Sequence, residues 1–557
     1  MLRKIIAAFL MSSLILSITT PARAGMYIDP NVSELGLDLS ENAEIGRMPS
    51  VFAAAYNPEI SQTWRVCESA TDAKCTEAKA INGIANLSVC SVDSQMDCIS
   101  SVWAVDPAGN KISGTFSKHV PSNSKYKFDE NVAMHVPRSD GAGGVWTIPG
   151  VKTSAGTESY FVAAQETLNS QKGAGISMSQ SKFDISNLLV AIFPTQEVNG
   201  SFQLNTPVDS SMGGASYGSN GTQFAPDGSV CASTDTSVCY ALRQFPTGYR
   251  FGITIHLADK QLGWFHGRFY KPNVTINAWK LGQEISIEAE PVKVPRLNFA
   301  VPNKDIPEAV KNLVMNGQEI GMKGDGKSRT LISEFLGSTK TMAILSAFTP
   351  AFGDKATSTD TYWSFRTLNG DQGRVQQCAK SSDNLSGLVT TNALTYSAGP
   401  PDFDAKLGTL NYKVASPHYE ANGDVAEGTY DLSLRSDVAR CIYGFTNAPI
   451  QAEVSVLSND GEKKIATTVI NERNGWLYLS AKGFTFSSPT IQVKLSQEKP
   501  VPLPSAPPTP APSVEQSMAP AATKQPAKKV TISCVKGKTV KKITAINPKC
   551  PAGFKKK

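Results

Sequence analysis

Long apolar runs are absent from the sequence after residue 24. Beyond that point, polar and turn-forming residues interrupt every apolar stretch well short of the roughly 20 residues that a transmembrane helix needs. The opening MLRKIIAAFLMSSLILSITTPARAG does contain an apolar run, from Ile5 to about Ile18, which the following TTP ends early. A basic start, an apolar middle and an A-x-A ending are typical of a secretory signal peptide. We therefore expect residues 1–24 to be removed on export, leaving a chain with no integral membrane span.

Histidine is scarce, with five residues in the chain, and none of them forms an H-x3-H or H-E-x-x-H set. Such sets are the local signatures of histidine metal sites, so histidine metal chemistry has little support, and no Walker or Rossmann fingerprint for a nucleotide occurs in a strand-to-helix context. The GASYG pattern at 214–218 would make Ser216 a hydrolase nucleophile, but loop-like sequence flanks it where a nucleophile elbow needs a strand and a helix. We assign no catalytic residue, no metal ligand and no cofactor.

Acidic residues are absent from the last thirty residues, KKVTISCVKGKTVKKITAINPKCPAGFKKK, which contain ten lysines. The chain has a formal net charge of +6, and residues 1–24 contribute three positive charges, so residues 25–527 carry a net −7. An acidic body with a basic tail predicts that the tail contacts an anionic polymer or surface. The tail has no arginine and Phe554 as its one aromatic residue, which argues against nucleic acid as the partner.

The predicted partner is an anionic cell-wall polymer or an acidic polysaccharide, because lysines act as mobile point charges toward a diffuse polyanion. The candidate polyanion-binding residues are Lys536, Lys538, Lys541, Lys542, Lys549, Lys555, Lys556 and Lys557. The alternative is a solvated tail that only aids export or solubility.

The number of cysteines is even, which in an exported chain predicts disulfides. They are Cys67, Cys75, Cys90, Cys98, Cys231, Cys239, Cys378, Cys441, Cys534 and Cys550. Three segments, starting at Cys67, Cys90 and Cys231, share the spacing C-x7-C around a polar loop. Cysteines so spaced can face each other across the base of a hairpin, and we expect local pairing worth roughly 2–3 kcal/mol. Zinc is disfavoured, since its paired cysteines are usually two to four residues apart.

The two remaining cysteine pairs have different expected roles. Cys378 and Cys441 are expected to join two strands of one β domain. Cys534 and Cys550 are expected to lock the basic tail into a small β module, because about thirty residues cannot bury enough surface to fold without such a bond.

Strand patterns dominate the body and predict a mainly β fold with several sandwich-like domains. Residues 251–257 alternate apolar with smaller or polar residues, and residues 451–470 read as a hairpin that turns at Asn459-Asp460-Gly461. A short helix is predicted over 305–316, with Asp305 as its N-cap and Ile306, Val310, Leu313 and Val314 on its buried face. Residues 328–348 are ambiguous between helix and strand.

The expected organisation follows these patterns. It comprises a signal peptide (1–24), an N-terminal β region with C-x7-C loops (25–190), a second β domain (191–300), a junction with a helix (301–350), a C-terminal sandwich-like domain (351–496), a Pro-rich linker (497–527) and the basic disulfide-bonded module (528–557). The linker composition predicts an extended spacer.

GWFHGRFYKP, from Gly263, contains a candidate ligand face. Strand alternation places Trp264, His266, Arg268 and Tyr270 on one side and Phe265 with Phe269 on the other. Aromatic rings beside a guanidinium and an imidazole could bind a sugar or an anion. The simpler interpretation, which we favour, sends Phe265 and Phe269 into the core and leaves the opposite side as half-exposed sheet surface.

ISCVKGKTVKKITAINPKCPAGFKKK, residues 532–557, resembles the basic two-cysteine C-terminal segment of largely uncharacterised secreted actinobacterial surface proteins, which usually follows a Pro-rich linker. The body phrases CIYGF, PHYEANG and GWLYLSAKGFTFSSP are similar to such proteins as well. The resemblance implies a cell-envelope setting in a bacterium with a thick wall, and it transfers no catalytic residue.

The function expected from these features is non-enzymatic. We expect a secreted cell-surface protein, active in adhesion, surface structure or ligand capture and held by its basic C-terminal module. One alternative is an extracellular hydrolase acting on polysaccharide with catalytic acids that the sequence does not identify. A second is a freely secreted binding protein whose tail has no anchoring role.

Overall fold

The computed structural model describes residues 27–497 and 530–556, apart from gaps at 42–43, 70–71, 77, 123, 125, 172–181, 211–215, 219–221, 281, 318, 369–373, 381–383, 458–462, 466–468, 487–489, 537–538, 546–547 and 552. The predicted signal peptide and nearly all of the Pro-rich linker lie outside these residues. The chain divides into two compact units, Met1–Glu498, called here the body, and Lys499–Lys557, which contains the basic module of residues 528–557. Among the described helices, none is both long and apolar enough to cross a membrane.

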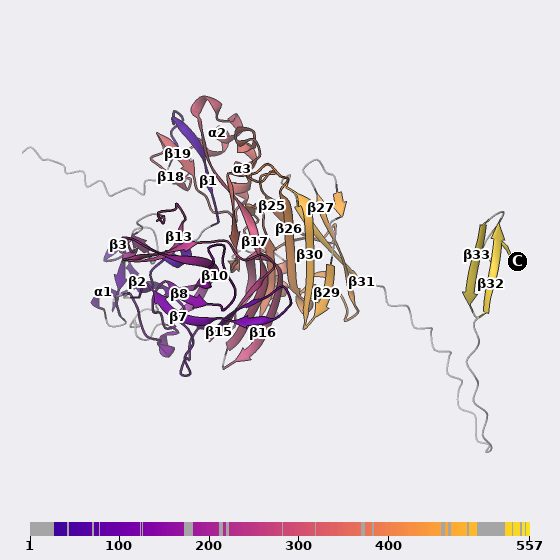
Figure 1. The fold of residues 1–557 in the computed structure, drawn as a ribbon, viewed down its shortest axis with the longest axis horizontal. Coiled ribbons are helices and arrows are strands. Elements are labelled where there is room, and N and C mark those ends of the chain that lie inside the picture. The colour runs from indigo at the N-terminus through magenta and orange to yellow at the C-terminus, as the bar shows by residue number, and fades with distance from the viewer. Residues whose placement is uncertain are drawn as a thin grey trace, which may run out of the picture. The chain divides into compact units, whose positions relative to one another are not determined.

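One long sheet runs through the body (Figure 1). Its strands, in spatial order, are β3 (Ser61–Cys67), β2 (Val51–Asn57), β4 (Ala80–Asn86), β9 (Ser159–Gln171), β10 (Asp184–Asn199), β21 (Ser364–Leu368), β16 (Gly263–Trp279), β22 (Leu385–Thr391), β26 (Glu427–Arg435), β30 (Trp476–Thr485) and β29 (Val469–Arg473). Neighbours are antiparallel except β16 and β22, which run parallel. This sheet therefore joins early and late parts of the body sequence.

A second sheet packs against the first and shares the long strand β16 with it. Its order is β6 (Lys111–Ser113), β5 (Cys98–Val105), β15 (Arg250–Leu257), β17 (Gly282–Pro302) and β16. The predicted alternation over 251–257 is confirmed, since Phe251, Ile253 and Ile255 are buried. They share one apolar cluster with Val162 of β9 and Phe265 of β16, so two sheets enclose this core as in a sandwich.

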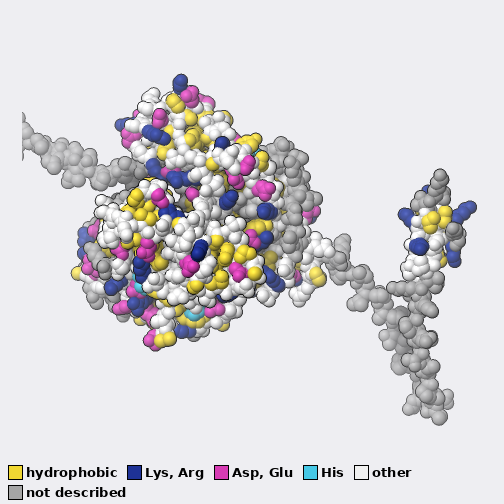
Figure 2. All heavy atoms as spheres, in the orientation of Figure 1, with side chains coloured by type: hydrophobic (Ala, Val, Ile, Leu, Met, Phe, Trp, Pro, Cys, Tyr) yellow, Lys and Arg dark blue, Asp and Glu magenta, His cyan; other side chains and the backbone are white. Residues whose placement is uncertain are grey.

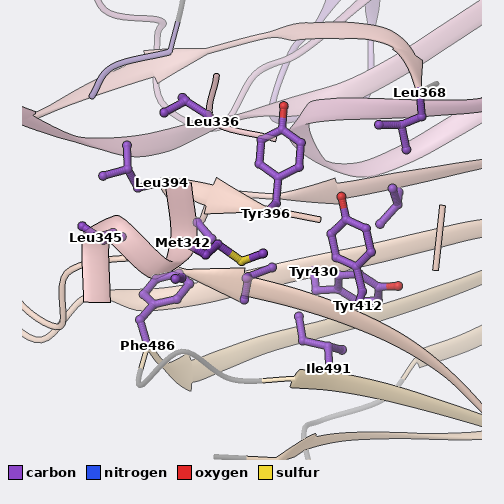
Figure 3. Close-up of a cluster of buried hydrophobic side chains, with 14 of the residues drawn as sticks. Leu336, Met342, Leu345, Leu368, Leu394, Tyr396, Tyr412, Tyr430, Phe486 and Ile491 are labelled. Carbon is purple, nitrogen blue, oxygen red and sulfur yellow. The ribbon is translucent and has the colours of Figure 1, made fainter. Parts of the chain in front are cut away.

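A third sheet covers the other side of β26 and β30. Its order is β23 (Thr395–Tyr396), β25 (Thr409–Ala415), β31 (Thr490–Gln497), β27 (Ile450–Leu457) and β28 (Lys463–Ile465), and β24 (Asp402–Asp404) pairs with β25. Figure 3 shows the core between the layers, where Tyr412 of β25 lies beside Tyr430 of β26 with ring centroids 5.8 Å apart. The predicted hairpin is confirmed by the pairing of Leu457 with Lys463, whereas its turn residues lie outside the described part.

The remaining body strands pair with strands of the first two sheets or with one another, and β11 with β12 forms a separate two-stranded sheet. They are β1 (Glu34–Leu39), β7 (Thr115–Val120), β8 (Gly143–Thr147), β11 (Thr206–Val208), β12 (Ser216–Gly218), β13 (Cys231–Asp235), β14 (Val238–Leu242), β18 (Met322–Lys323), β19 (Arg329–Ile332) and β20 (Ser358–Tyr362). Of these, β1 pairs with both β17 and β19.

The predicted helix over 305–316 is shorter than expected. A 3-10 turn covers Asn303–Asp305, and α2 spans Glu308–Val314 with Pro307 at its N-cap, so Asp305 is not the cap. Leu313 is 37% exposed, whereas Val310 and Val314 are buried. Residues 328–348, which the sequence left ambiguous between helix and strand, contain one of each: β19 comes first and the start of α3 (Thr339–Phe352) follows. The side chain of Ser338 caps α3.

The disulfides are largely those that the spacing predicts. Cys90 bonds Cys98, Cys231 bonds Cys239 and Cys534 bonds Cys550. Cys67 is also disulfide-bonded, although the side chain of Cys75 in α1 (Ala73–Thr76) lies outside the description. Of the two C-x7-C disulfides described in full, Cys231–Cys239 spans an antiparallel hairpin, β13 and β14, as expected. Cys90–Cys98 does not, because the bridge next to it, between Val89 and Ile99, is parallel.

The prediction for Cys378 and Cys441 was right about the bond and wrong about the elements. Cys378 lies in α4 (Arg374–Lys380) and Cys441 in α5 (Ser436–Tyr443), so the bond joins two helices instead of two strands. The segment from Ser436 forms a helix because Val438, Ala439 and Ile442 make one apolar face toward the core.

The fold is mainly β with sandwich-like layers, as the sequence predicts. The finer division of the body at 190, 300 and 350 stays a prediction. Those positions lie inside β10, β17 and α3 respectively.

Candidate functional site

The candidate ligand face on β16 is mostly buried. Trp264, His266 and Arg268 are 3%, 1% and 1% exposed, and Phe265 and Phe269 on the other side are fully buried. The expected entry of both phenylalanines into the core is confirmed. The other side is not sheet surface, because β16 is a central strand with packed layers on both faces.

Arg268 is enclosed by acceptors. Its Nε lies 2.5 Å from a carboxylate oxygen of Glu41, and its other nitrogens donate to the backbone oxygens of Thr391, Ala393 and Leu394. A buried charge requires pairing of this kind. Arg268 therefore ties β16 to the loop that follows β22, and it is not free to bind a ligand.

His266 stacks on Tyr396, with ring centroids 3.7 Å apart and an interplanar angle of 4°. Burial, followed by the positive charges of Arg268 and Arg366, holds the pKa of His266 well below its ordinary value. The imidazole is therefore neutral at physiological pH and acts as a packed aromatic side chain.

Tyr270 is the member of the predicted face that lines a cavity. The pairing of β16 with β17 shifts register between Tyr270 and Asn273, and Lys271 has a positive φ of 50°. This bulge carries Tyr270, Lys271 and Pro272 into the wall of a cavity of about 560 Å³ beside β26 and β30, called here the β26–β30 cleft.

The floor of the cleft is the polar face of β26, β30 and β29. In the alternating sequences TYDLSLR (β26) and WLYLSAK (β30), every second side chain, such as Leu432 and Leu479, enters the core. The side chains that alternate with them point to the opposite face of the sheet, toward the cleft. The register pairs Asp431 with Ser480 and Ser433 with Tyr478, so these four side chains share one face.

Charge of both signs lines the cleft. Its cations are Arg250, Lys271, Arg473 and Lys482, its acids are Glu427 and Asp431, and Asn471 adds an amide.

Asp431 is the most enclosed of these charged groups. Its Oδ2 accepts hydrogen bonds from the Lys271 backbone N–H and the Thr390 hydroxyl, both at 2.9 Å. Burial nevertheless raises the pKa of Asp431 to about 6, against the lowering effect of Ser480, the Lys271 N–H and Thr390. The carboxyl group is therefore largely ionised above pH 6 and becomes neutral in mild acid.

The basic module is a small sheet in which β32 (Val530–Lys536) pairs with β33 (Thr539–Ala545) and with β34 (Lys555–Lys556). Cys534 is fully buried and bonded to Cys550, as predicted. The six described candidate lysines are exposed, whereas Lys538 and Lys557 lie outside the description. On the face that Figure 2 shows, dark blue lysine side chains surround a few apolar ones on this unit.

The register distributes the lysines over both faces of this sheet. Cys534 lies opposite Lys541 on one side and Lys556 on the other, so both lysines project from its face. Lys542, paired with Ser533, and Lys555, paired with Val535, project from the opposite face.

Sequence analysis found one residue of the cleft, Tyr270. Asp431, Ser433 and Tyr478 carried a usable signal, namely polar residues at every second position of two neighbouring strands. The contributions of Arg250 and Lys271 depend on pairing between distant strands and on a bulge, which no local pattern indicates.

Two features set aside at the sequence level can be located. Within the described residues, one cluster has metal-ligand geometry, Cys90, Cys98 and His256, but its two sulfurs form a disulfide and offer no thiolate. Ser216 starts the three-residue strand β12, and its side chain lies outside the description.

Comparisons with protein families, with curated proteins and with solved structures found no match to this chain.

Proposed function

We propose that this chain is an exported binding protein that is held at an anionic cell surface by its basic module while its body captures a ligand. The observation that carries the proposal is the exposed lysine set on a disulfide-bonded sheet without a single acid. Disulfides of this number are typical of proteins in oxidising, extracytoplasmic compartments.

The electrostatics of the module support a diffuse polyanion as its partner. Lysines project from both faces of the described sheet, and residues 528–557 contain no Asp or Glu that competes for them. Contacts of this kind release counterions and weaken steeply with added salt. An anionic wall polymer or an acidic polysaccharide has the required continuous charge.

The spacing of the two acidic residues that line the cleft favours ligand binding over glycoside hydrolysis. Glu427 and Asp431, its two carboxylates, lie four positions apart on β26, which corresponds to about 13 Å along a strand. Carboxyl pairs that cleave glycosides are separated by about 5–9.5 Å. The cleft therefore supports ligand capture, the non-enzymatic role, better than cleavage.

The test is fractionation of cells expressing the full chain and a variant with Lys541, Lys542, Lys555 and Lys556 replaced by Gln. We expect the unaltered chain to sediment with the envelope and to be released by about 0.5 M salt, and the variant to appear in the medium. The matched control replaces four exposed body lysines by Gln, namely Lys127, Lys152, Lys406 and Lys413. Retention of the module variant, or release of both variants alike, would refute electrostatic anchoring by the module.

A further inference from the structure

The β26–β30 cleft contains buried polar atoms that the protein does not satisfy. Asp431 and Ser433 are 3% and 1% exposed, yet Asp431 Oδ1 and Ser433 Oγ have no hydrogen-bond partner among the described residues. The Nε of Arg250 is also buried and has no hydrogen-bond partner among these residues. An unsatisfied buried polar atom costs about 1–3 kcal/mol, and such groups are rare in folded proteins without a reason. With the Oγ of Ser480, which lies opposite Asp431, four such atoms line one cavity, and this suits a ligand rich in hydroxyl groups.

The cations of the cleft fall into two kinds. Arg250 and Lys271 are paired with Glu288 and Glu290, at 3.0 and 3.4 Å, and their charges are largely compensated.

Arg473 and Lys482 have no carboxylate partner within the described part of the chain. Arg473 donates to the amide oxygen of Asn273 at 3.0 Å, and its guanidinium lies 4.8 Å from the ring centroid of Tyr478. A guanidinium held in this way keeps nitrogens available for bidentate contact with a carboxylate.

The cavity is large enough for an extended ligand. Its volume of about 560 Å³ lies within the usual range of ligand sites, about 300–1,000 Å³. The rings of Tyr270 and Tyr478, which line the cavity, add apolar surface against which the C–H groups of a sugar can pack.

From these observations we propose that the cleft binds an acidic oligosaccharide, with Arg473 and Lys482 contacting its carboxylates and Ser433 and Asp431 its hydroxyl groups. This assignment rests on the capture role proposed above and gives that role a ligand class. The carboxylate contacts account for the uncompensated cations, and the hydroxyl contacts account for the unsatisfied buried groups.

The test is calorimetric titration of the full chain with a tetramer of galacturonic acid and with its fully methyl-esterified form, which has the same skeleton without charge. We expect the esterified tetramer to bind at least tenfold more weakly. Arg473→Gln should weaken binding of the acidic tetramer about tenfold, which corresponds to the loss of one charge-assisted hydrogen-bonded contact. Ser433→Ala should weaken both ligands by a similar factor, because it removes a hydroxyl contact.

The basic module could bind the acidic tetramer by itself, so two controls are needed. The module variant with four Gln substitutions should retain the binding that Arg473→Gln removes, and Lys494→Gln, an exposed lysine of β31, should change nothing. Equal affinity for the two tetramers, no detectable binding of either, or unchanged binding by Arg473→Gln would overturn the assignment. If salt-sensitive retention persists in any of these cases, the anchoring role stands and the ligand class alone is rejected.

Discussion

Glu166 on β9 and Asp97, the residue before β5, form a carboxyl pair inside the body. Burial, followed by the charge of Asp97, raises the pKa of the fully buried Glu166 well above its ordinary value. Burial also raises the pKa of Asp97 to about 6, although the Ala258 N–H donates to its Oδ1. His135 and Asp259, 3.2 Å apart, are the other ionisable groups close to the pair. We infer that Glu166 keeps its proton to a higher pH than an exposed glutamate does, because its carboxyl group is buried close to that of Asp97.

This pair predicts that the body loses stability as the pH rises. Both folded pKa values exceed their unfolded values, so the folded state binds more protons, and the stabilisation is complete below about pH 4 and declines through pH 6. A Gln at position 166 has nearly the same shape as Glu and stays neutral at every pH, so it never places a second negative charge beside Asp97. Glu166→Gln should therefore raise the free energy of unfolding by about 1–2 kcal/mol at pH 7 and leave it nearly unchanged at pH 4. Urea denaturation at both pH values measures this.

The matched control is Glu59→Gln, since that side chain is 74% exposed. The free energy of unfolding of Glu59→Gln should equal that of the unaltered chain at both pH values. A Glu166→Gln variant with the same change between pH 4 and pH 7 as the unaltered chain would show that the pair does not exchange protons on unfolding.

The residues that sequence reasoning misplaced share one physical cause. Trp264, His266 and Arg268 alternate with apolar residues, which is typical of a strand with one solvated face. Arg268 can nevertheless be buried because Glu41 and three backbone oxygens satisfy it, and all of these are distant in sequence. A local pattern gives no information about such partners. Residues 251–257 were predictable because every group on their buried face is apolar.

At the scale of elements, the disulfide between α4 and α5 anchors two short helices to the core. Its sequence separation is 63 residues, whereas Cys231 and Cys239 are 8 apart. In the chain-entropy model, closing the longer loop stabilises by about 4 kcal/mol and the shorter by about 2.5 kcal/mol. Cys378→Ala with Cys441→Ala should lower the free energy of unfolding by the larger amount, and Cys231→Ala with Cys239→Ala by the smaller.

Guanidinium denaturation of the two double variants provides the comparison. Equal losses, or a larger loss for the β13–β14 pair, would mean that local packing and not loop closure decides how much each bond contributes. Cys231, Cys239 and Cys378 are buried and Cys441 is exposed, so the packing lost when sulfur is replaced by hydrogen is no greater at the α4–α5 pair and does not explain a larger loss there.

Element types were predictable where the local pattern was unambiguous. The hairpin of β27 and β28 followed from its turn residues, and the centre of α2 from its apolar spacing. The ends of α2 were not, because Pro307 sets the start of the helix and the tertiary environment leaves Leu313 in solvent. The helices at Cys378 and Cys441 were missed because short amphipathic segments of eight residues or fewer resemble buried strands.

At the scale of the molecule, the continuity of the central sheet predicts that the body unfolds cooperatively. This sheet links β2 and β30 through an unbroken series of paired strands, and β16 pairs with strands of both the central sheet and the second sheet. We expect the body to unfold in a single calorimetric transition with equal van't Hoff and calorimetric enthalpies. Resolved transitions would instead support the division at 190, 300 and 350.

The control for that experiment is Cys534→Ala with Cys550→Ala. Because the basic module is a separate compact unit, opening its disulfide should leave the body transition where it is. A shift of that transition would show that the two units stabilise each other.

The global arrangement was the least accessible to sequence reasoning. The basic module was predictable as a disulfide-bonded β unit, because its charge and its two cysteines are local in sequence. The cleft was not, since it requires β15, β16, β26, β29 and β30 to converge. Pairing between distant strands is specified by the complementarity of whole faces, which no single segment contains.

The lysines on opposite faces of the basic module have a consequence for the number of ways in which it can bind. A flexible polyanion can lie against either face and in many registers along each, so the bound state has high degeneracy and retains much of its orientational entropy. Loss of any one lysine then removes some of these arrangements and leaves the others. Affinity should decline in small, nearly equal steps as lysines are removed, without a single dominant residue.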